Sequence, residues 1–300
     1  MAEHHGHAHH GTEQRLALSL IITLAVVLAE AVGGYFSNSL ALLSDAGHNF
    51  TDSFALGLSL IAARISRWSP DSRATFGYQR VGLLAAVING SSLFIIAFVI
   101  SAEAIRRLSA PPVINSRLMM IFGALGFAAN STIVLLLRHG HKDLNIKSAW
   151  MHMLGDAFAS FGVIISAAII IFTGWRLADP LASLMIALII LLGGLRVVSE
   201  ALHVFLELAP RHLNVEAVAK DICAFPGVMG VHDVHLWALT KGHVMFTAHV
   251  WVKDEKLSRL QQLSGELKQM LGNMGIDHVT LEFQCMECED KGIYCEYKEQ

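Results

Sequence analysis

The chain has 300 residues, of which 54% are hydrophobic and 16% are charged, and its net charge is −3. Soluble domains carry about 25% charged residues, so this composition excludes a disordered chain and argues against an ordinary cytosolic enzyme. The absence of a run of Lys and Arg argues against nucleic-acid binding. The four Cys are too few for a disulfide scaffold, whereas the 16 His give the chain a surplus of side chains that can bind metal.

Apolar runs begin near residue 16 and follow one another through the first two thirds of the chain. A helix needs about 20 apolar residues to cross a bilayer, and strands are shorter than these runs. The first run lacks the basic segment and small-residue cleavage site of a signal peptide, so it is interpreted as a permanent span. The sequence therefore predicts an α-helical membrane protein with six transmembrane helices, at residues 16–32, 40–63, 81–105, 118–137, 149–172 and 181–205.

An even number of spans places both termini on the same side of the membrane. Lys and Arg residues near the ends of the spans are more frequent on that side, although Arg106 and Arg107 fall on the other. The positive-inside rule then predicts cytoplasmic N- and C-termini. The short loops favour a multi-pass protein of a bacterial inner membrane.

The composition changes at about residue 208, where the apolar runs end. Hydrophobic spacing then predicts a helix, two strands, a helix and a third strand, at residues 212–224, 228–239, 243–252, 257–274 and 278–283. This pattern indicates a small α+β domain of the ferredoxin-like or metallochaperone-like kind. The predicted organisation is a His-rich cytoplasmic tail at 1–14, a transmembrane domain at 15–207 and a cytoplasmic metal-binding and dimerisation domain at 208–300.

Two of the predicted spans carry a His and an Asp four residues apart, namely His48 with Asp52 and His152 with Asp156. Residues at i and i+4 lie on the same face of a helix. Inserting an ionisable side chain into the bilayer costs free energy, so a favourable interaction must compensate for it. If the two helices face each other, two imidazoles and two carboxylates meet, which suits tetrahedral Zn²⁺ better than Mg²⁺ or Cu⁺.

A single pair of this kind often forms only a hydrogen bond that helps helices pack, but its repetition on two spans favours a metal site. Asp45 lies about one turn before His48 and is either a hydrogen-bond partner of the ligands or a residue at the mouth of the site. Four protein ligands leave no position for water, so the site suits passing an ion rather than catalysis. The rival hypotheses are an intramembrane metalloenzyme, whose usual HExxH motif is absent, and a metal sensor that does not conduct.

Four segments of the sequence resemble the cation diffusion facilitator family of zinc transporters. They are SDAGHNFTD at 44–52, TFGYQR at 75–80, DLNIKSAWMHMLGD at 143–156 and VHDVHLW at 231–237. The resemblance covers nearly the whole chain and implies a homodimer that exports Zn²⁺ from the cytosol in exchange for protons. It also implies that the transported ion is held by His48, Asp52, His152 and Asp156.

The residue chemistry agrees with this implied exchange. Metal ligands bind only when they are deprotonated, so metal entry releases protons and proton entry releases metal. An imidazole titrates near pH 6.5, which is within physiological reach. The predicted partners are thus Zn²⁺, protons, the lipid bilayer and a second copy of the chain, with no nucleic acid.

The predicted cytoplasmic domain carries a second group of metal-binding residue types. His232 and His235 fall in its first strand, His249 in its second and Glu282 in its third, and Cys285-x-x-Cys288 follows. A Cys-x-x-Cys pair in a cytosolic context is typical of a zinc half-site. The order resembles the cytoplasmic metal site of vesicular zinc transporters, although the spacing after Glu282 is shorter. That resemblance implies a structural or regulatory zinc held by His232, His249, Glu282, Cys285 and Cys288.

In this arrangement His235 would hydrogen-bond to the ligands without binding the metal itself. The alternative to a metal site is that these His and Cys are unrelated surface residues. The N-terminal His tract is interpreted as metal-gathering, with an expression tag as the alternative, and it could complete the site of the partner subunit. The tract consists of His4, His5, His7, His9 and His10. The family resemblance further suggests a charge pair between Arg80 and Glu207, where span three begins and span six ends.

Overall fold

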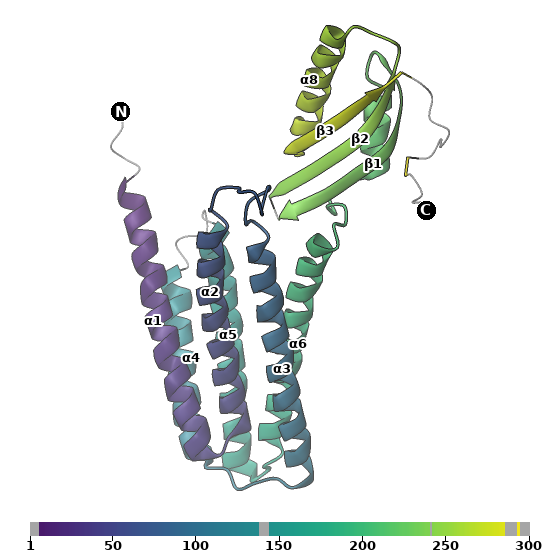
Figure 1. Cartoon of the computed structure of the whole chain (residues 1–300). Coiled ribbons are helices and arrows are strands. Elements are labelled where there is room, and N and C mark those ends of the chain that lie inside the picture. Colours follow the sequence, from purple (N-terminus) through teal and green to yellow (C-terminus); the bar gives the residue numbers. More distant parts are fainter. Residues whose placement is uncertain (1–5, 138–143, 241, 286–292, 295–300) are drawn as a thin grey trace. The chain divides into compact units, whose positions relative to one another are not determined.

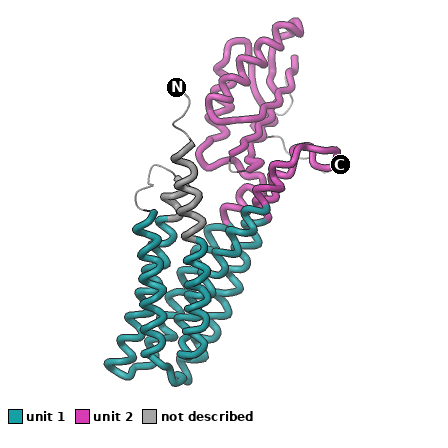
Figure 2. The backbone as a smooth tube through the Cα atoms, turned by 90° about the vertical axis from the view of Figure 1, so that its left-hand side faces the viewer, with its two compact units in different colours: residues 1–61, 85–198 teal, residues 62–84, 199–300 magenta. Residues whose placement is uncertain are grey.

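The computed structural model describes residues 6–137, 144–240, 242–285 and 293–294. The chain divides into two compact units, residues 1–61 with 85–198 and residues 62–84 with 199–300 (Figure 2). Long helices fill the first unit, and the second contains a small sheet with its own helices (Figure 1). The predicted combination of a helical membrane part with a small α+β domain is confirmed.

Six helices correspond to the six predicted spans, and they differ from the predicted ranges mainly at their ends. They are α1 (Gly6–Ser37), α2 (Leu40–Ile65), α3 (Val81–Ser109), α4 (Ser116–Leu137), α5 (Leu144–Thr173) and α6 (Ala178–Phe205). Among the described residues, five of these helices are long and apolar enough to cross a membrane. The sixth, α2, has the length but carries the polar residues of the SDAGHNFTD segment.

Helix α1 begins at Gly6, well before the apolar run that starts at residue 16. Once a helix is nucleated, each further residue costs little, so helical backbone extends into the polar sequence before the span. His4 and His5 lie outside the described residues. His7, His9 and His10 lie in α1, and the structure describes their backbone but not their side chains.

The core of the helical unit lies where α2 to α6 meet. Leu42, Leu93, Met119, Val163 and Ile190 come one from each of these helices and are at most 5% exposed. Large apolar side chains elsewhere on the helices point outwards, and Phe172, for example, is 85% exposed. A surface of this kind is what a lipid environment requires of a bundle.

Asp179, at the start of α6, holds the N-terminus of α2 in place. Its side chain is fully buried and accepts hydrogen bonds from Ser39 Oγ at 2.6 Å, Leu40 N at 2.9 Å and Ala41 N at 3.1 Å. A carboxylate is favourable here because the first backbone N–H groups of a helix have no partners within it. This contact fixes the position of the helix that carries His48 and Asp52.

The second unit folds in the predicted order, with α7 (Val215–Cys223), β1 (Val228–Thr240), β2 (His243–Val252), α8 (Leu257–Asn273) and β3 (His278–Gln284). Strands β1 and β2 are antiparallel neighbours, and β3 pairs with β2 in parallel. Parallel strands need a crossover connection, which α8 provides. Side chains of β2 alternate between the two faces of the sheet, so Phe246, Ala248 and Val250 pack with the helices and His249 lies on the opposite face.

Candidate functional site

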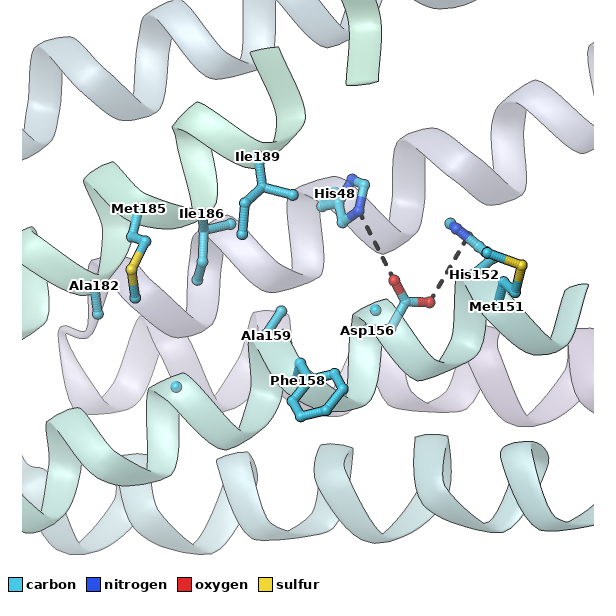
Figure 3. A pocket seen from close by; sticks show the side chains of 12 residues that line it. His48, Met151, His152, Asp156, Phe158, Ala159, Ala182, Met185, Ile186 and Ile189 are labelled. Carbon is cyan, nitrogen blue, oxygen red and sulfur yellow. Dashed lines mark ion pairs between the residues drawn. The ribbon is translucent and has the colours of Figure 1, made fainter. Parts of the chain in front are cut away.

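The His and Asp pairs of α2 and α5 meet in the bundle. Figure 3 shows His48 and His152 on either side of Asp156. The Nε2 atom of His48 lies 3.8 Å from Oδ1 of Asp156, and that of His152 lies 3.7 Å from Oδ2 of Asp156. Asp52 Oδ2 lies 3.2 Å from His152 Nε2 and 3.5 Å from His48 Nδ1. Each imidazole therefore contacts both carboxylates.

These distances can be compared with those around a single zinc ion. Ligand atoms about 2.0–2.2 Å from Zn²⁺ lie roughly 3.4 Å from one another in a tetrahedron. His48, Asp52 and Asp156 offer ligand atoms that all lie within 4.8 Å of one another. The ring centroids of His48 and His152 are 6.2 Å apart, so His152 would have to approach His48 for all four side chains to hold one ion.

A cavity of about 380 Å³ lies beside these residues. The remaining side chains that line it come from α5 and α6 and are apolar, such as Phe158 and Ile186 (Figure 3). The side chain of Asp156 is 3% exposed and that of His152 is 44% exposed. Within the site, the Asp156 carboxylate is therefore buried, whereas the His152 imidazole is accessible.

The second predicted metal group lies on the open face of the sheet. His232, His249 and Glu282 pair with one another across β1, β2 and β3, so they form one row. His249 Nε2 lies 3.5 Å from Glu282 Oε2, and the rings of His232 and His249 are 5.2 Å apart. His232 Nε2 is buried without a hydrogen-bond partner, which fits a nitrogen oriented toward a metal.

The other predicted residues of this group are Cys285, Cys288 and His235. Cys285 is exposed and directly follows β3, and Cys288 lies outside the described residues. His235 contacts Asp233, with its Nε2 3.0 Å from Oδ1 of that carboxylate. The described residues thus bring together His232, His249 and Glu282 of the predicted set.

Comparison with known families decides what kind of protein carries these sites. Residues 16–206 match the model of the cation efflux transmembrane domain, and residues 210–282 match that of the cation efflux protein cytoplasmic domain. The chain belongs to the cation efflux family. It is a multi-pass membrane transporter of cations and not an enzyme.

Full-length relatives of this cation efflux protein are found in several bacteria. The metal cation efflux system protein CzcD of Cupriavidus metallidurans is 39% identical over 96% of this chain and 92% of its own length. The zinc transporter ZitB of Escherichia coli is 36% identical over 95% and 93% of the two chains. The cadmium, cobalt and zinc/H⁺-K⁺ antiporter of Bacillus velezensis is 35% identical over 99% and 96%.

The structure of this cation efflux protein also shows polar residues that the sequence analysis missed or left open. Glu30 of α1 is fully buried next to Asp45, and Asn49 donates a hydrogen bond to it. Glu30 could have been noticed in the sequence because it is a charged residue inside an apolar run. Asp45 itself is fully buried, not at a mouth, and accepts a hydrogen bond from Ser160 at 2.8 Å.

Asp233 is a second residue that the sequence analysis missed. Its Oδ2 atom lies 3.4 Å from His249 Nε2, so it faces the row of His232, His249 and Glu282. It occupies an irregularity in the register of β1 and has a φ of 51°. The motif VHDVHLW contains this residue, but strand alternation places neighbouring side chains on opposite faces, and only a bulge brings it to the face of His249.

Proposed function

We propose that this protein exports Zn²⁺ from the cytosol in exchange for protons, and that His48, Asp52, His152 and Asp156 hold the ion during transport. The observation that carries this proposal is the meeting of both His–Asp pairs, in which each imidazole lies within 3.8 Å of both carboxylates. A single His–Asp contact between two helices is often only a packing contact. Here one contact lies within each helix and two contacts join α2 to α5, so two nitrogen and two oxygen donors are close together.

The donor set supports zinc as cargo. Two imidazoles and two carboxylates match the ligand types and coordination number of Zn²⁺, whereas Mg²⁺ prefers six oxygen ligands. Two of the three relatives described above carry zinc in their names, one of them together with cadmium and cobalt. Zinc is therefore the proposed substrate, and cadmium and cobalt are the related ions to test beside it.

Proton exchange follows from the chemistry of the ligands. The imidazoles must lose protons and the carboxylates must be ionised before they can bind Zn²⁺. When the site faces the cytosol, Zn²⁺ displaces these protons, and when it faces the other side, protons from that side displace Zn²⁺. The contacts of Asp52 and Asp156 with both imidazoles provide the acceptors and donors that such an exchange needs in the absence of metal.

The proposed transporter is a homodimer in a bacterial inner membrane, with both termini in the cytoplasm. The excess of Lys and Arg on one side supports this orientation. The match to the family's cytoplasmic domain supports dimers. The domain organisation proposed with it is a His-rich tail at 1–14, a transmembrane part at 15–207 and a cytoplasmic domain at 208–300.

A structural or regulatory zinc is proposed for the cytoplasmic domain. His232, His249 and Glu282 would hold it, and Asp233 adds a carboxylate to the same face of the sheet. Cys285 and Cys288 are the proposed remaining ligands, with His235 as a partner of Asp233. The N-terminal His4, His5, His7, His9 and His10 are proposed to collect Zn²⁺ near the cytoplasmic face.

Zinc flux into reconstituted vesicles tests the transport site. Vesicles with an acidic interior receive Zn²⁺ outside, and uptake is followed for the parent protein and for Asp156→Asn. We expect the variant to fall to the level of protein-free vesicles because it removes one charged oxygen ligand. Asp221→Asn, the same chemical change at an exposed position of α7, should transport like the parent.

Three outcomes contradict this proposal in different ways. Uptake by Asp156→Asn equal to that of the parent would show that the site is assigned wrongly. Zinc binding by the parent without any flux would favour a sensor that changes the cytoplasmic domain without conducting. Metal-dependent hydrolysis that is lost in His152→Ala would point to an intramembrane enzyme instead.

A further inference from the structure

A second polar cluster lies inside the bundle beside the proposed metal site. Glu30 of α1 and Asp45 of α2 are both 0% exposed, and their carboxyl groups lie against each other. Asn49 Nδ2 donates to Glu30 Oε2 at 3.2 Å, and Ser160 Oγ donates to Asp45 Oδ2 at 2.8 Å. The remaining oxygens, Glu30 Oε1 and Asp45 Oδ1, have no hydrogen-bond partner.

Two ionised carboxylates are unfavourable in this arrangement when no cation lies nearby. An ionised carboxylate only accepts hydrogen bonds, and two like charges in contact away from water repel each other strongly. Among the described residues, no Lys, Arg or His forms an ion pair with Glu30 or Asp45. A single proton between the two carboxyls supplies the missing donor and removes one of the charges.

The packing around Glu30 favours a proton over a metal ion. A Cβ atom added to Gly126 of α4 would lie only 2.1 Å from Glu30 Oε1, so this carboxyl rests directly on the α4 backbone. A metal ion would need several further oxygen ligands around it, and here the unpartnered oxygen faces a helix backbone. Asn130, the polar neighbour from α4, is uncharged and hydrogen-bonds to Ser160 at 3.3 Å.

The pair lies close enough to the metal site to respond to its charge. The charge of Asp156 on α5 acts on Glu30, and the charge of Asp45 acts on Asp156. Neither Glu30 nor Asp45 forms a hydrogen bond or an ion pair with His48, Asp52 or His152 among the described residues. A divalent cation bound beside Asp156 would therefore act on the pair through space and favour its fully ionised form.

We propose that Glu30 and Asp45 form a proton-binding site separate from the metal site, which loses its proton when Zn²⁺ binds and regains it when Zn²⁺ leaves. This inference rests on the proposed zinc–proton exchange and adds a second place for a counter-transported proton. The O–H bond of the protonated carboxyl breaks, the proton passes to water, and both carboxylates remain ionised beside the cation. The reverse change follows release of the metal.

Infrared difference spectroscopy of the full chain, recorded as Zn²⁺-bound minus metal-free, tests this site without any flux. The parent should lose the C=O stretching band of a protonated carboxylic acid when Zn²⁺ binds. Carbon-13 labelling of the aspartate and glutamate carboxyls should shift this band, because we assign the proton to the Glu30–Asp45 pair. The parent protein alone shows whether a carboxyl loses its proton when Zn²⁺ binds, even if a variant does not fold.

Glu30→Gln and Glu103→Gln are the matched variants. Glu30→Gln should lack the band change, still bind Zn²⁺, and release about one proton fewer for each Zn²⁺ bound. Glu103 of α3 lies 2.7 Å from Arg106 Nη2 and 2.8 Å from Arg107 Nε, so it is ionised at both stages, and Glu103→Gln should keep the band change.

Three results would overturn the inference. The first is a parent protein whose acid band does not change when Zn²⁺ binds, which would make the pair a static packing contact. The second is a band change that persists in Glu30→Gln. The third is loss of the band change together with loss of Zn²⁺ binding in Glu30→Gln, which would make Glu30 part of the metal site. These experiments measure binding at equilibrium. Each result can therefore be interpreted even if the protein does not transport Zn²⁺.

Discussion

The Nε2 atom of His152 lies 3.2 Å from the Oδ2 atom of Asp52, although the two residues belong to α5 and α2. This contact joins the two helices at the point where the proposed cargo binds. Any rearrangement that moves α2 relative to α5 therefore changes the proposed metal site directly. The hydrogen bonds from the start of α2 to Asp179 fix one end of α2, so such movement would be largest towards its other end.

Gly126 tests the position of Glu30. Gly126→Ala would place a methyl group 2.1 Å from Glu30 Oε1, so we expect it to lower stability in detergent by about 1–3 kcal/mol. Gly193→Ala is the matched control, because no atom lies within 4 Å of the added carbon and alanine favours helix by about 0.5–1 kcal/mol. Thermal unfolding should shift in opposite directions, and equal shifts would show that Glu30 does not rest on α4.

Asp233 tests the metal site proposed on the sheet of the second unit. Asp233→Asn keeps a residue that tolerates the φ of 51° but removes the negative charge that faces His249. We expect zinc affinity at this site to fall by about 10-fold or more, as when a supporting carboxylate is removed. Equilibrium dialysis of the full chain measures it, with His243→Gln at the exposed start of β2 as control. Unchanged affinity in Asp233→Asn would exclude this residue from the site.

The ion pair between Arg80 and Glu207 is short but exposed. Arg80 Nη2 lies 2.6 Å from Glu207 Oε1, and the two side chains are 42% and 55% exposed. Exposed pairs contribute at most about 1 kcal/mol because water screens them. A double-mutant cycle with Arg80→Gln and Glu207→Gln should therefore give a coupling free energy below that value. A coupling of several kcal/mol would mean that a partner subunit buries the pair.

The loop between α2 and α3 should depend on pH through Asp71. Its carboxylate accepts hydrogen bonds from Tyr78 Oη, Ala74 N and Arg73 N, each at 2.8 Å, and these bonds, that of Tyr78 foremost, lower the pKa of Asp71. A lowered folded-state pKa means that the stabilisation is complete above the ordinary value of about 3.9. It is lost as the pH falls through the lowered value.

Hydrogen exchange at the amide of Ala74 measures this effect. Protection should be constant from neutral pH down to about pH 4 and should weaken below it. Tyr78→Phe removes the largest contribution, so its loss of protection should begin at a higher pH than in the parent. Identical profiles for the two proteins would show that the Tyr78 hydroxyl does not support the ionised form of Asp71.

The sequence predicted most elements because hydrophobic spacing determines them. The range 243–252 of the second predicted strand agrees fully with β2, and the predicted spans differ from the helices mainly at their polar ends. The spacing of His48 with Asp52 and of His152 with Asp156 also predicted that each pair shares a helix face. The meeting of the two pairs could only be assumed, since it depends on how α2 packs against α5.

Two residues show what spacing cannot reveal. Asp233 reaches His249 only because the strand bulges and its backbone adopts a positive φ, and neither follows from residue type alone. Glu30 lies in an apolar run, so the sequence indicates that its charge has a compensating partner, but it does not indicate which residue that is. Its neighbour Asp45 comes from another helix, so tertiary packing decides the contact.

Anomalous X-ray diffraction at the zinc absorption edge tests the central claim most directly. The full-length protein would be crystallised with Zn²⁺, and the anomalous map would be inspected between α2 and α5. We expect a peak about 2.0–2.2 Å from a nitrogen of each imidazole and an oxygen of each carboxylate. A map without a peak there, with the side chains of His48, Asp52, His152 and Asp156 turned to separate places, would contradict the account.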